Sequence, residues 1–319
     1  MEAYPRTLAE LEARFSTEDA CREYLARLRW PDGFRCRWCG HAGGWRLSRW
    51  VFECAACSCQ TSVTAGTVFA RTRKPLLLWF RAMWLITSQK TGASARGVQR
   101  VLGLGSYETA WTWLHKLRRA MVRPGRDRLS GRIEVDETLL GASEKGVLGR
   151  ETDTKAKIVV AAQEDGPRIG RVRMSRVPDF SGKSLVGFIQ GAVEPGSTVH
   201  TDGWQAYNGL TAKGYRHEVT PLKGRNEAAS ELLPRVHRVV SLLKRWLMGT
   251  LHGGVSHEHL DYYLDEFTFR FNRRTSRSRG KLFYRLAQQA VAVAPVPYDK
   301  LIKHVRKPKT PETQDVGAT

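Results

Sequence analysis

Two Cys-x2-Cys pairs constrain this chain more than any other feature of its sequence. Cys36 and Cys39 form the first pair and Cys54 and Cys57 the second, with fourteen residues between the pairs. Each pair can bring two thiolates to one side of a tetrahedral Zn²⁺ ion. A module this small also needs a metal staple in order to fold. We therefore predict a four-cysteine zinc ribbon over residues 31–70, with a structural Zn²⁺ ion.

The other two cysteines, Cys21 and Cys59, fall outside this spacing. We expect each of them to be a small buried side chain and not a metal ligand. A redox or disulfide role for the paired cysteines is the alternative to zinc. It is disfavoured because residues 1–16 carry three glutamates and no apolar block, so no secretory signal is expected.

The charge balance of the chain indicates a polyanionic partner. Fifty-two Lys and Arg residues against 31 Asp and Glu residues leave a net charge of +21, and the sequence pI is near 10.1. Nucleic acid is the usual partner of such a chain, because each neutralised phosphate releases condensed counterions. A membrane is disfavoured, since Arg81 interrupts the most apolar stretch, Leu76–Ile86, well before the ~18 residues that a spanning helix needs. We expect a cytoplasmic, nucleoid-associated protein that binds double-stranded DNA.

Helical patterns lie on both sides of the predicted ribbon. Residues 1–30 are expected to form a helical lead-in. Residues 74–123 carry apolar side chains at helical spacing in three segments, which begin at Pro75, Ser94 and Ser106.

The third of these helices follows a short turn, GLGS, and carries three basic residues, Lys116, Arg118 and Arg119. A short glycine-bearing turn before a basic helix is typical of a helix-turn-helix, so we predict a DNA-binding segment here. An ordinary three-helix spacer with a solvated basic end is the alternative.

The stretch Arg132–Gly141 is predicted to be a strand with a functional carboxylate. Ile133, Val135 and Glu137 alternate with Glu134, Asp136 and Thr138, which is the period of an extended segment. A carboxylate on a rigid strand supplies the hard oxygen ligands that Mg²⁺ requires.

The pattern that follows indicates a mixed α/β fold, a ribonuclease-H-like core, with a second carboxylate. Strands are expected at 156–162 and 169–177, a helix at 180–193, and a short strand at 198–200 that leads to Asp202. The order strand, strand, strand, helix, strand is that of a ribonuclease-H-like core, in which the first and fourth strands lie side by side. We therefore expect Asp136 and Asp202 to converge on one metal site.

A long helix is expected from about Leu233 to Met248, with a polar stripe on one side. His237, Ser241 and Lys244 stand at positions i, i+4 and i+7, so that two turns return Lys244 to the side of His237. A buried histidine beside a lysine that reaches for solvent is the alternative interpretation. A further helix at 256–272 would close a catalytic domain of residues 130–290, and residues 303–319 are expected to be a disordered basic tail.

Several of these motifs together resemble prokaryotic insertion-sequence transposases of the DDE type that carry an N-terminal zinc ribbon. The resemblance covers about residues 16–283, and its motifs are RWPDGFRCRWCG, IEVDETLLG, HTDGWQAYNGL and HRVVSLLKRWLMG. It implies a catalytic core that uses Mg²⁺ or Mn²⁺, binds the terminal inverted repeats of an element and works as a homo-oligomer on DNA. Position by position, Asp136 looks like the first catalytic acid and Asp202 like the second.

The third position departs from the family pattern. Where relatives place Glu or Asn, this chain has His237, followed seven residues later by the Lys244 that the group carries. A neutral imidazole can hold a metal ion but suits Mn²⁺ or Zn²⁺ better than Mg²⁺. Glu227 and Glu231 are the alternative candidates for a third carboxylate ligand.

The sequence thus predicts a transposase that cleaves DNA strands and transfers them into target DNA, with Asp136, Asp202, His237 and Lys244 in its site. A non-catalytic DNA-binding regulator, or a decayed transposase, is the first alternative. The second is a nuclease that uses the same two aspartates but only water as the nucleophile.

Overall fold

The computed structural model describes residues 4–123, 125–141, 152, 154–221, 229–251 and 255–303. These residues form two compact units. The first contains the described residues of Met1–Pro124 and Arg273–His304, and the second contains those of Gly125–Asn272. Within the described residues no helix has both the length and the apolar character needed to cross a bilayer.

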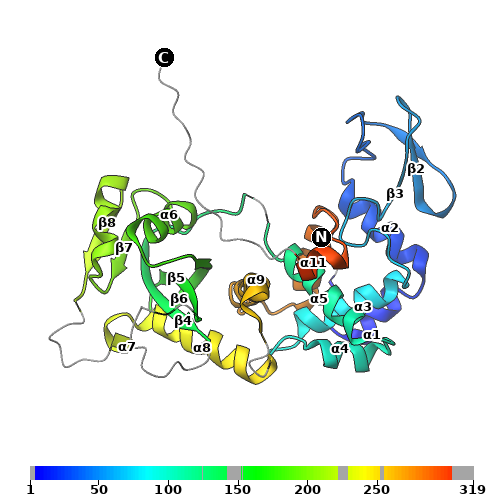
Figure 1. The fold of residues 1–319 in the computed structure, drawn as a ribbon. Helices are drawn as coiled ribbons and strands as arrows, with labels where there is room; N and C mark the ends of the chain where they lie inside the picture. The colour runs from blue at the N-terminus through cyan, green and yellow to red at the C-terminus, as the bar shows by residue number, and fades with distance from the viewer. Residues whose placement is uncertain are drawn as a thin grey trace, which may run out of the picture. The chain divides into compact units, whose positions relative to one another are not determined.

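The first unit combines a small sheet with helices from both ends of the chain (Figure 1). Its elements are α1 (Leu8–Arg14), α2 (Glu18–Arg29), β1 (Gly44–Arg46), η1 (Ser48–Trp50), β2 (Val51–Cys54), β3 (Gln60–Ser62), α3 (Leu76–Ser88), α4 (Ala95–Leu102), α5 (Tyr107–Ala120), α10 (Arg279–Ala290) and α11 (Tyr298–Lys303).

The zinc-ribbon region is an antiparallel sheet of three strands in the order β1-β2-β3. The hairpin of β1 and β2 lies between the two cysteine pairs. Its hydrophobic core is small, because only Phe34, Cys36 and Cys54 are buried in it, with Trp30 and Phe52 packed against them. Little apolar area is therefore available to hold this sheet together.

The three predicted helices α3, α4 and α5 are present, and local capping explains where they begin and end. The hydroxyls of Ser94 and Ser106 accept N–H groups in the first turns of α4 and α5, as N-cap residues do. Gly103 ends α4 in the left-handed conformation, with φ of 61°. Arg118, however, is almost fully buried, so of the three basic residues predicted to face DNA only Lys116 and Arg119 keep partial exposure.

The C-terminal helices α10 and α11 belong to the first unit and not to the second. The ring of Phe283 in α10 packs on Phe80 of α3 with centroids 5.5 Å apart, and the backbone N–H of Val68 donates to Ala290. The expected catalytic domain of residues 130–290 thus extends past the second unit, which ends at Asn272. Of the predicted tail, Lys303 is the last residue of α11, and residues 304–319 lie outside the described residues.

The second unit is a mixed sheet of five strands with helices on both faces (Figure 1). Its elements are β4 (Arg132–Leu140), β5 (Ala156–Asp165), β6 (Arg168–Val177), α6 (Gly182–Ala192), β7 (Thr198–Thr201), η2 (Gln205–Lys213), β8 (Arg216–Val219), α7 (Ala229–Leu232), α8 (Pro234–Leu251), η3 (His257–His259) and α9 (Leu260–Phe271).

The strand order is β6-β5-β4-β7-β8. β4, β5 and β6 pair antiparallel, whereas β7 runs parallel to β4 and β8 runs parallel to β7. The first and fourth strands of this unit are therefore neighbours, as predicted for a ribonuclease-H-like core. The fifth strand, β8, was not anticipated from the sequence.

Alternation along the strands divides the hydrophobic core into two layers. Ile133 and Val135 of β4 pack in the layer that contains α6. The layer on the opposite face contains side chains of α8 and α9, among them Val236 and Leu243. Side chains at the even positions of β4, including Asp136, therefore face α8.

Candidate active site

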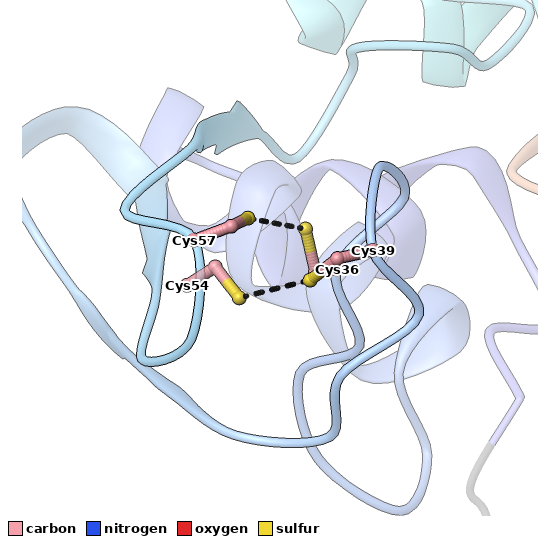
Figure 2. Close-up of side chains that lie close together, drawn as sticks. All are labelled: Cys36, Cys39, Cys54 and Cys57. Atoms are coloured by element: carbon pink, nitrogen blue, oxygen red, sulfur yellow. Dashed lines mark hydrogen bonds between the residues drawn. The ribbon is translucent and has the colours of Figure 1, made fainter.

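The four paired cysteines meet at one point of the first unit, as Figure 2 shows. Their Sγ atoms all lie within 4.8 Å of one another. The Sγ atoms of Cys36 and Cys57 are 3.6 Å apart, and so are those of Cys39 and Cys54. A tetrahedron with Zn–S bonds of ~2.3 Å has edges of about 3.8 Å, so the four thiols fit a structural Zn²⁺ ion.

The backbone supports the thiolate form at two of the four sulfurs, those of Cys36 and Cys54, whereas the pKa values of Cys39 and Cys57 are raised. The N–H of Trp38 donates to Cys36 Sγ and the N–H of Ala56 donates to Cys54 Sγ, each at 3.4 Å. Hydrogen bonds from the backbone of Cys39 and Trp38 lower the pKa of Cys36 to about 6, which favours the form that binds metal. Of the two remaining cysteines, Cys21 is buried, and its burial raises its thiol pKa to about 12.

In the second unit, Asp136 lies on the central strand β4 opposite Val160 of β5. Its Oδ1 atom accepts the N–H of Glu137 at 2.8 Å. The side chain is 13 % exposed, so that it is largely enclosed but can still be reached from solvent. A carboxylate in this position is held by a buried strand.

Asp202 directly follows β7, whose last registered pair with β4 joins His200 to Glu134. When this parallel register is continued by two residues, Asp202 falls beside Asp136, one strand spacing of about 4.8 Å away. The Oδ1 atom of Asp202 accepts the N–H of Trp204 at 3.0 Å, which fixes the carboxylate at the start of the loop after β7.

His237 reaches the same place from α8. Its Nε2 atom lies 3.5 Å from Asp136 Oδ2, and its side chain is 28 % exposed. Burial lowers the pKa of His237, the carboxylates of Glu134 and Asp202 oppose this shift, and Lys244 adds to it. The net effect favours the neutral imidazole, which is the form that can bind a metal ion.

Lys244 lies on the exposed side of α8, and its charge acts on His237. Between these two residues the hydroxyl of Ser241 donates to the carbonyl of His237 at 2.9 Å. The polar stripe predicted from the i, i+4, i+7 spacing is therefore present on one side of the helix. An exposed cationic end close enough to act on His237 suits a phosphate group.

The two aspartates and His237 do not form a closed metal cage. Among the described residues, the four cysteines form the only group of three or more candidate ligands whose donor atoms all lie within 4.8 Å of one another. An open arrangement is compatible with Mg²⁺ or Mn²⁺, because Mg²⁺ usually keeps several water ligands and takes only one or two carboxylates from the protein.

The two glutamates considered as alternative third metal ligands, Glu227 and Glu231, are not placed at the site by any described contact. Glu231 lies in α7 with an exposed side chain. Glu227 lies outside the described residues.

Sequence reasoning missed two groups close to the aspartates. Tyr207 of η2 is fully buried, and burial raises its pKa well above the ordinary value, with the carboxylates of Glu137, Asp136 and Asp202 adding to the shift. The second group is Glu134, which is 1 % exposed. A glutamate on an otherwise buried strand was the available signal, because such a charge requires a partner.

A zinc ribbon followed by a mixed sheet, with Asp136 on the central strand and Asp202 directly after the parallel strand beside it, is the arrangement expected of a DDE-type transposase. Comparison with family models agrees with this. Residues 128–272 match the ISXO2-like transposase domain, and residues 16–60 match the transposase zinc-ribbon domain. The two matches together span more than half of the chain, which belongs to the insertion-sequence transposases of this type. A comparison with curated proteins finds no match.

Proposed function

We propose that this protein is an active DNA transposase that binds the terminal inverted repeats of its element, cleaves a strand at each end and joins the freed end to target DNA. The observation that carries the proposal is the approach of His237 Nε2 to Asp136 Oδ2 at 3.5 Å. It brings together a residue of α8 and a residue of β4 that are about a hundred positions apart in the sequence. Asp202 is expected beside them from the register of β7.

In this proposal Asp136, Asp202 and His237 hold the divalent metal ions. When bound, these ions supply Lewis-acid stabilisation of the attacking and leaving oxygens of an in-line phosphoryl transfer. The protein's part is to keep the three ligands in place on a rigid strand, at the end of its neighbour and on a packed helix. Water would be the nucleophile in the first cut, and the freed 3′-hydroxyl would attack target DNA in the second step.

We assign phosphate binding near the scissile bond to Lys244. It projects from the same side of α8 as His237, seven residues and about two turns further along the helix. The ammonium group acts as a point charge that can neutralise a nonbridging phosphate oxygen. The zinc ribbon and the helical segment α3 to α5 would supply binding to double-stranded DNA, to which the net charge of +21 also contributes.

The test is strand cleavage and strand transfer on a labelled duplex taken from the DNA that flanks the gene, with Mg²⁺ or Mn²⁺. Wild type is compared with Asp136→Ala, Asp202→Ala, His237→Ala and, as a matched control on another side of the same helix, Arg238→Ala. We expect wild type and Arg238→Ala to cut and join, and the other three variants to bind the duplex without cutting. The control is suitable because Arg238 follows His237 directly but is exposed.

Three other outcomes would change the assignment. Binding without cleavage by the wild type under both metals means a non-catalytic regulator or a decayed transposase. Cleavage without joining means a nuclease that uses only water. If His237→Ala stays active while Glu231→Ala or Glu227→Ala does not, the third ligand is a glutamate.

The histidine also predicts a metal preference. An imidazole ligand suits Mn²⁺ better than Mg²⁺, so we expect the wild type to work at lower Mn²⁺ than Mg²⁺ concentrations. His237→Glu is expected to shift this preference toward Mg²⁺, because it adds a hard oxygen ligand and a negative charge. An unchanged ratio of the two half-saturating concentrations would argue against His237 as a ligand.

A further inference from the structure

The buried carboxylate of Glu134 makes contacts that the proposed reaction does not use. Its Oε2 atom accepts two backbone N–H groups at the start of α8, from Arg235 at 2.7 Å and from Val236 at 2.9 Å. Its Oε1 atom accepts a hydrogen bond from the guanidinium of Arg235 at 2.9 Å. Glu134 thus binds both the backbone and a side chain of the same helical turn.

These contacts complete the N-terminus of α8. The first turn of a helix has N–H groups that find no partner within the helix. Pro234 has no N–H, and the N–H of His237 is the first to bond within the helix, to the carbonyl of Leu233 at 3.2 Å. Leu233 precedes the helix and has no side-chain oxygen to act as a cap. Glu134, which lies on β4, therefore accepts the two N–H hydrogen bonds that the side chain of a Ser or Asp just before the helix would normally accept.

The same arrangement fixes the guanidinium of Arg235. Arg235 also contacts Glu164 Oε1 at 2.5 Å, and Glu164 in turn pairs with Arg132 at 3.0 Å. Arg132 donates to Glu218 at 2.9 Å. This chain of charges links β8, β4 and β5 to the start of α8, so that the buried carboxylate of Glu134 is paired as its burial requires.

The position of Glu134 along β4 connects the cap to the site. Glu134 and Asp136 are two residues apart on one face of the strand, and the residues they contact on α8 are 235, 236 and 237 in succession. We propose that Glu134 is a positioning residue that holds α8 in register along β4 and so places His237 against Asp136. This inference rests on the proposed function only in taking His237 as a metal ligand.

The first test needs neither the catalytic metal nor DNA. Amide hydrogen exchange is measured on the zinc-loaded protein, without added Mg²⁺ or Mn²⁺, for Glu134→Gln and for Glu164→Gln. Both variants remove one carboxylate from Arg235, but only the first weakens the cap. We expect amides in the first turn of α8 to exchange about tenfold faster in Glu134→Gln, as helix ends do when a cap is lost. We expect Glu164→Gln to leave them within about threefold of wild type.

The second test measures Mn²⁺ binding by electron paramagnetic resonance. Loss of a group that orients a metal ligand typically weakens metal binding by about 10- to 100-fold. We expect a loss of this size in Glu134→Gln and none in Glu164→Gln. Equal losses in the two variants would mean that the charge network as a whole matters and not the cap, and would overturn the proposal.

The third test asks whether Glu134 acts through His237. In a His237→Ala background, Glu134→Gln should weaken Mn²⁺ binding by less than about twofold further, because residues that act as a unit are not additive. The same further loss in both backgrounds would show that Glu134 acts on the site by another route, which contradicts the proposal.

A second variant covers the case in which Glu134→Gln does not fold. Glu134→Asp keeps the charge but is one carbon shorter, so that it cannot reach both N–H groups and the guanidinium together. It is expected to fold and to show the same selective increase in exchange. Unchanged exchange at the start of α8 in Glu134→Asp would overturn the proposal. A wild type that fails to cleave DNA would instead remove the proposed function and leave the exchange result standing.

Discussion

The sharpest test of the zinc ribbon compares two cysteines that are two residues apart. Cys57 and Cys59 are both half-buried, and both pack against the small core of the ribbon. Only Cys57 belongs to the group of four thiols, with its Sγ atom 3.6 Å from that of Cys36. Serine replaces each thiol with a hydroxyl of similar shape, so Cys59→Ser is a matched control for Cys57→Ser.

The expected magnitude follows from the number of ligands. Structural zinc contributes about 10–16 kcal/mol of apparent binding free energy in small zinc modules. Shared over four thiolates, this is about 3 kcal/mol for one ligand, or roughly a 100-fold loss of affinity at ~1.4 kcal/mol for each factor of ten. The small apolar core of the ribbon, with Phe34 as its one buried aromatic residue, cannot replace that contribution.

The assay is zinc content per chain after gel filtration against a competing chelator. We expect about one zinc per chain in the wild type and in Cys59→Ser, and little or none in Cys57→Ser. Loss of zinc should also remove the near-ultraviolet circular dichroism of the stacked rings of Phe34 and Phe52, whose centroids are 5.4 Å apart.

Two results would refute this reasoning. Equal zinc content in both variants under chelator challenge would mean that Cys57 is not a ligand, or that three thiols suffice. Loss of zinc from Cys59→Ser alone would mean that the pairs are assigned wrongly, and that the ligand is Cys59.

Three further predictions concern packing and backbone conformation. Trp79→Ala should lower the free energy of unfolding by about 3–5 kcal/mol, since Trp79 is buried and stacks on another indole. Trp45→Ala is the control, because Trp45 is exposed, and it should change the free energy of unfolding by less than ~0.5 kcal/mol. In urea unfolding, Gly103→Ala should cost about 1 kcal/mol because φ is +61°, whereas Gly105→Ala should not. Cys21, with its pKa raised to about 12, should resist iodoacetamide at pH 8 until the protein unfolds; rapid native labelling would contradict its burial.

Much of the fold could be predicted because its signals are local. The cysteine spacing, the serine caps at Ser94 and Ser106 and the glycine at Gly103 each depend on a few neighbouring residues. The strands β4 and β5 were predicted from alternation and from an apolar run. That β4 and β7 are neighbours was predicted from the order of elements, which is that of a ribonuclease-H-like core.

Elements with weak local patterns were missed. β8 is four residues long and polar, and it becomes a strand only because the edge of β7 is available to pair with it. The expected catalytic domain ran to residue 290, whereas α10 and α11 lie in the compact unit of the N-terminal half, because their partners α3 and α5 lie nearly two hundred residues earlier in the chain. Arg118 was predicted to belong to a basic DNA-binding helix, with a solvated basic end as the alternative, but the packing of α5 encloses it.

The sequence by itself indicated which residues could form the proposed site: one aspartate on a strand, one directly after a strand, and a histidine and a lysine two turns apart on one helix. Only the tertiary structure decided that His237 meets Asp136, because that contact depends on how far α8 lies along β4. Helical periodicity gives the face of the helix on which a side chain lies, but not the position of the helix along the strand that it packs against. The position of α8 along β4 follows from the contacts between Glu134 and the first turn of α8, which join residues a hundred positions apart.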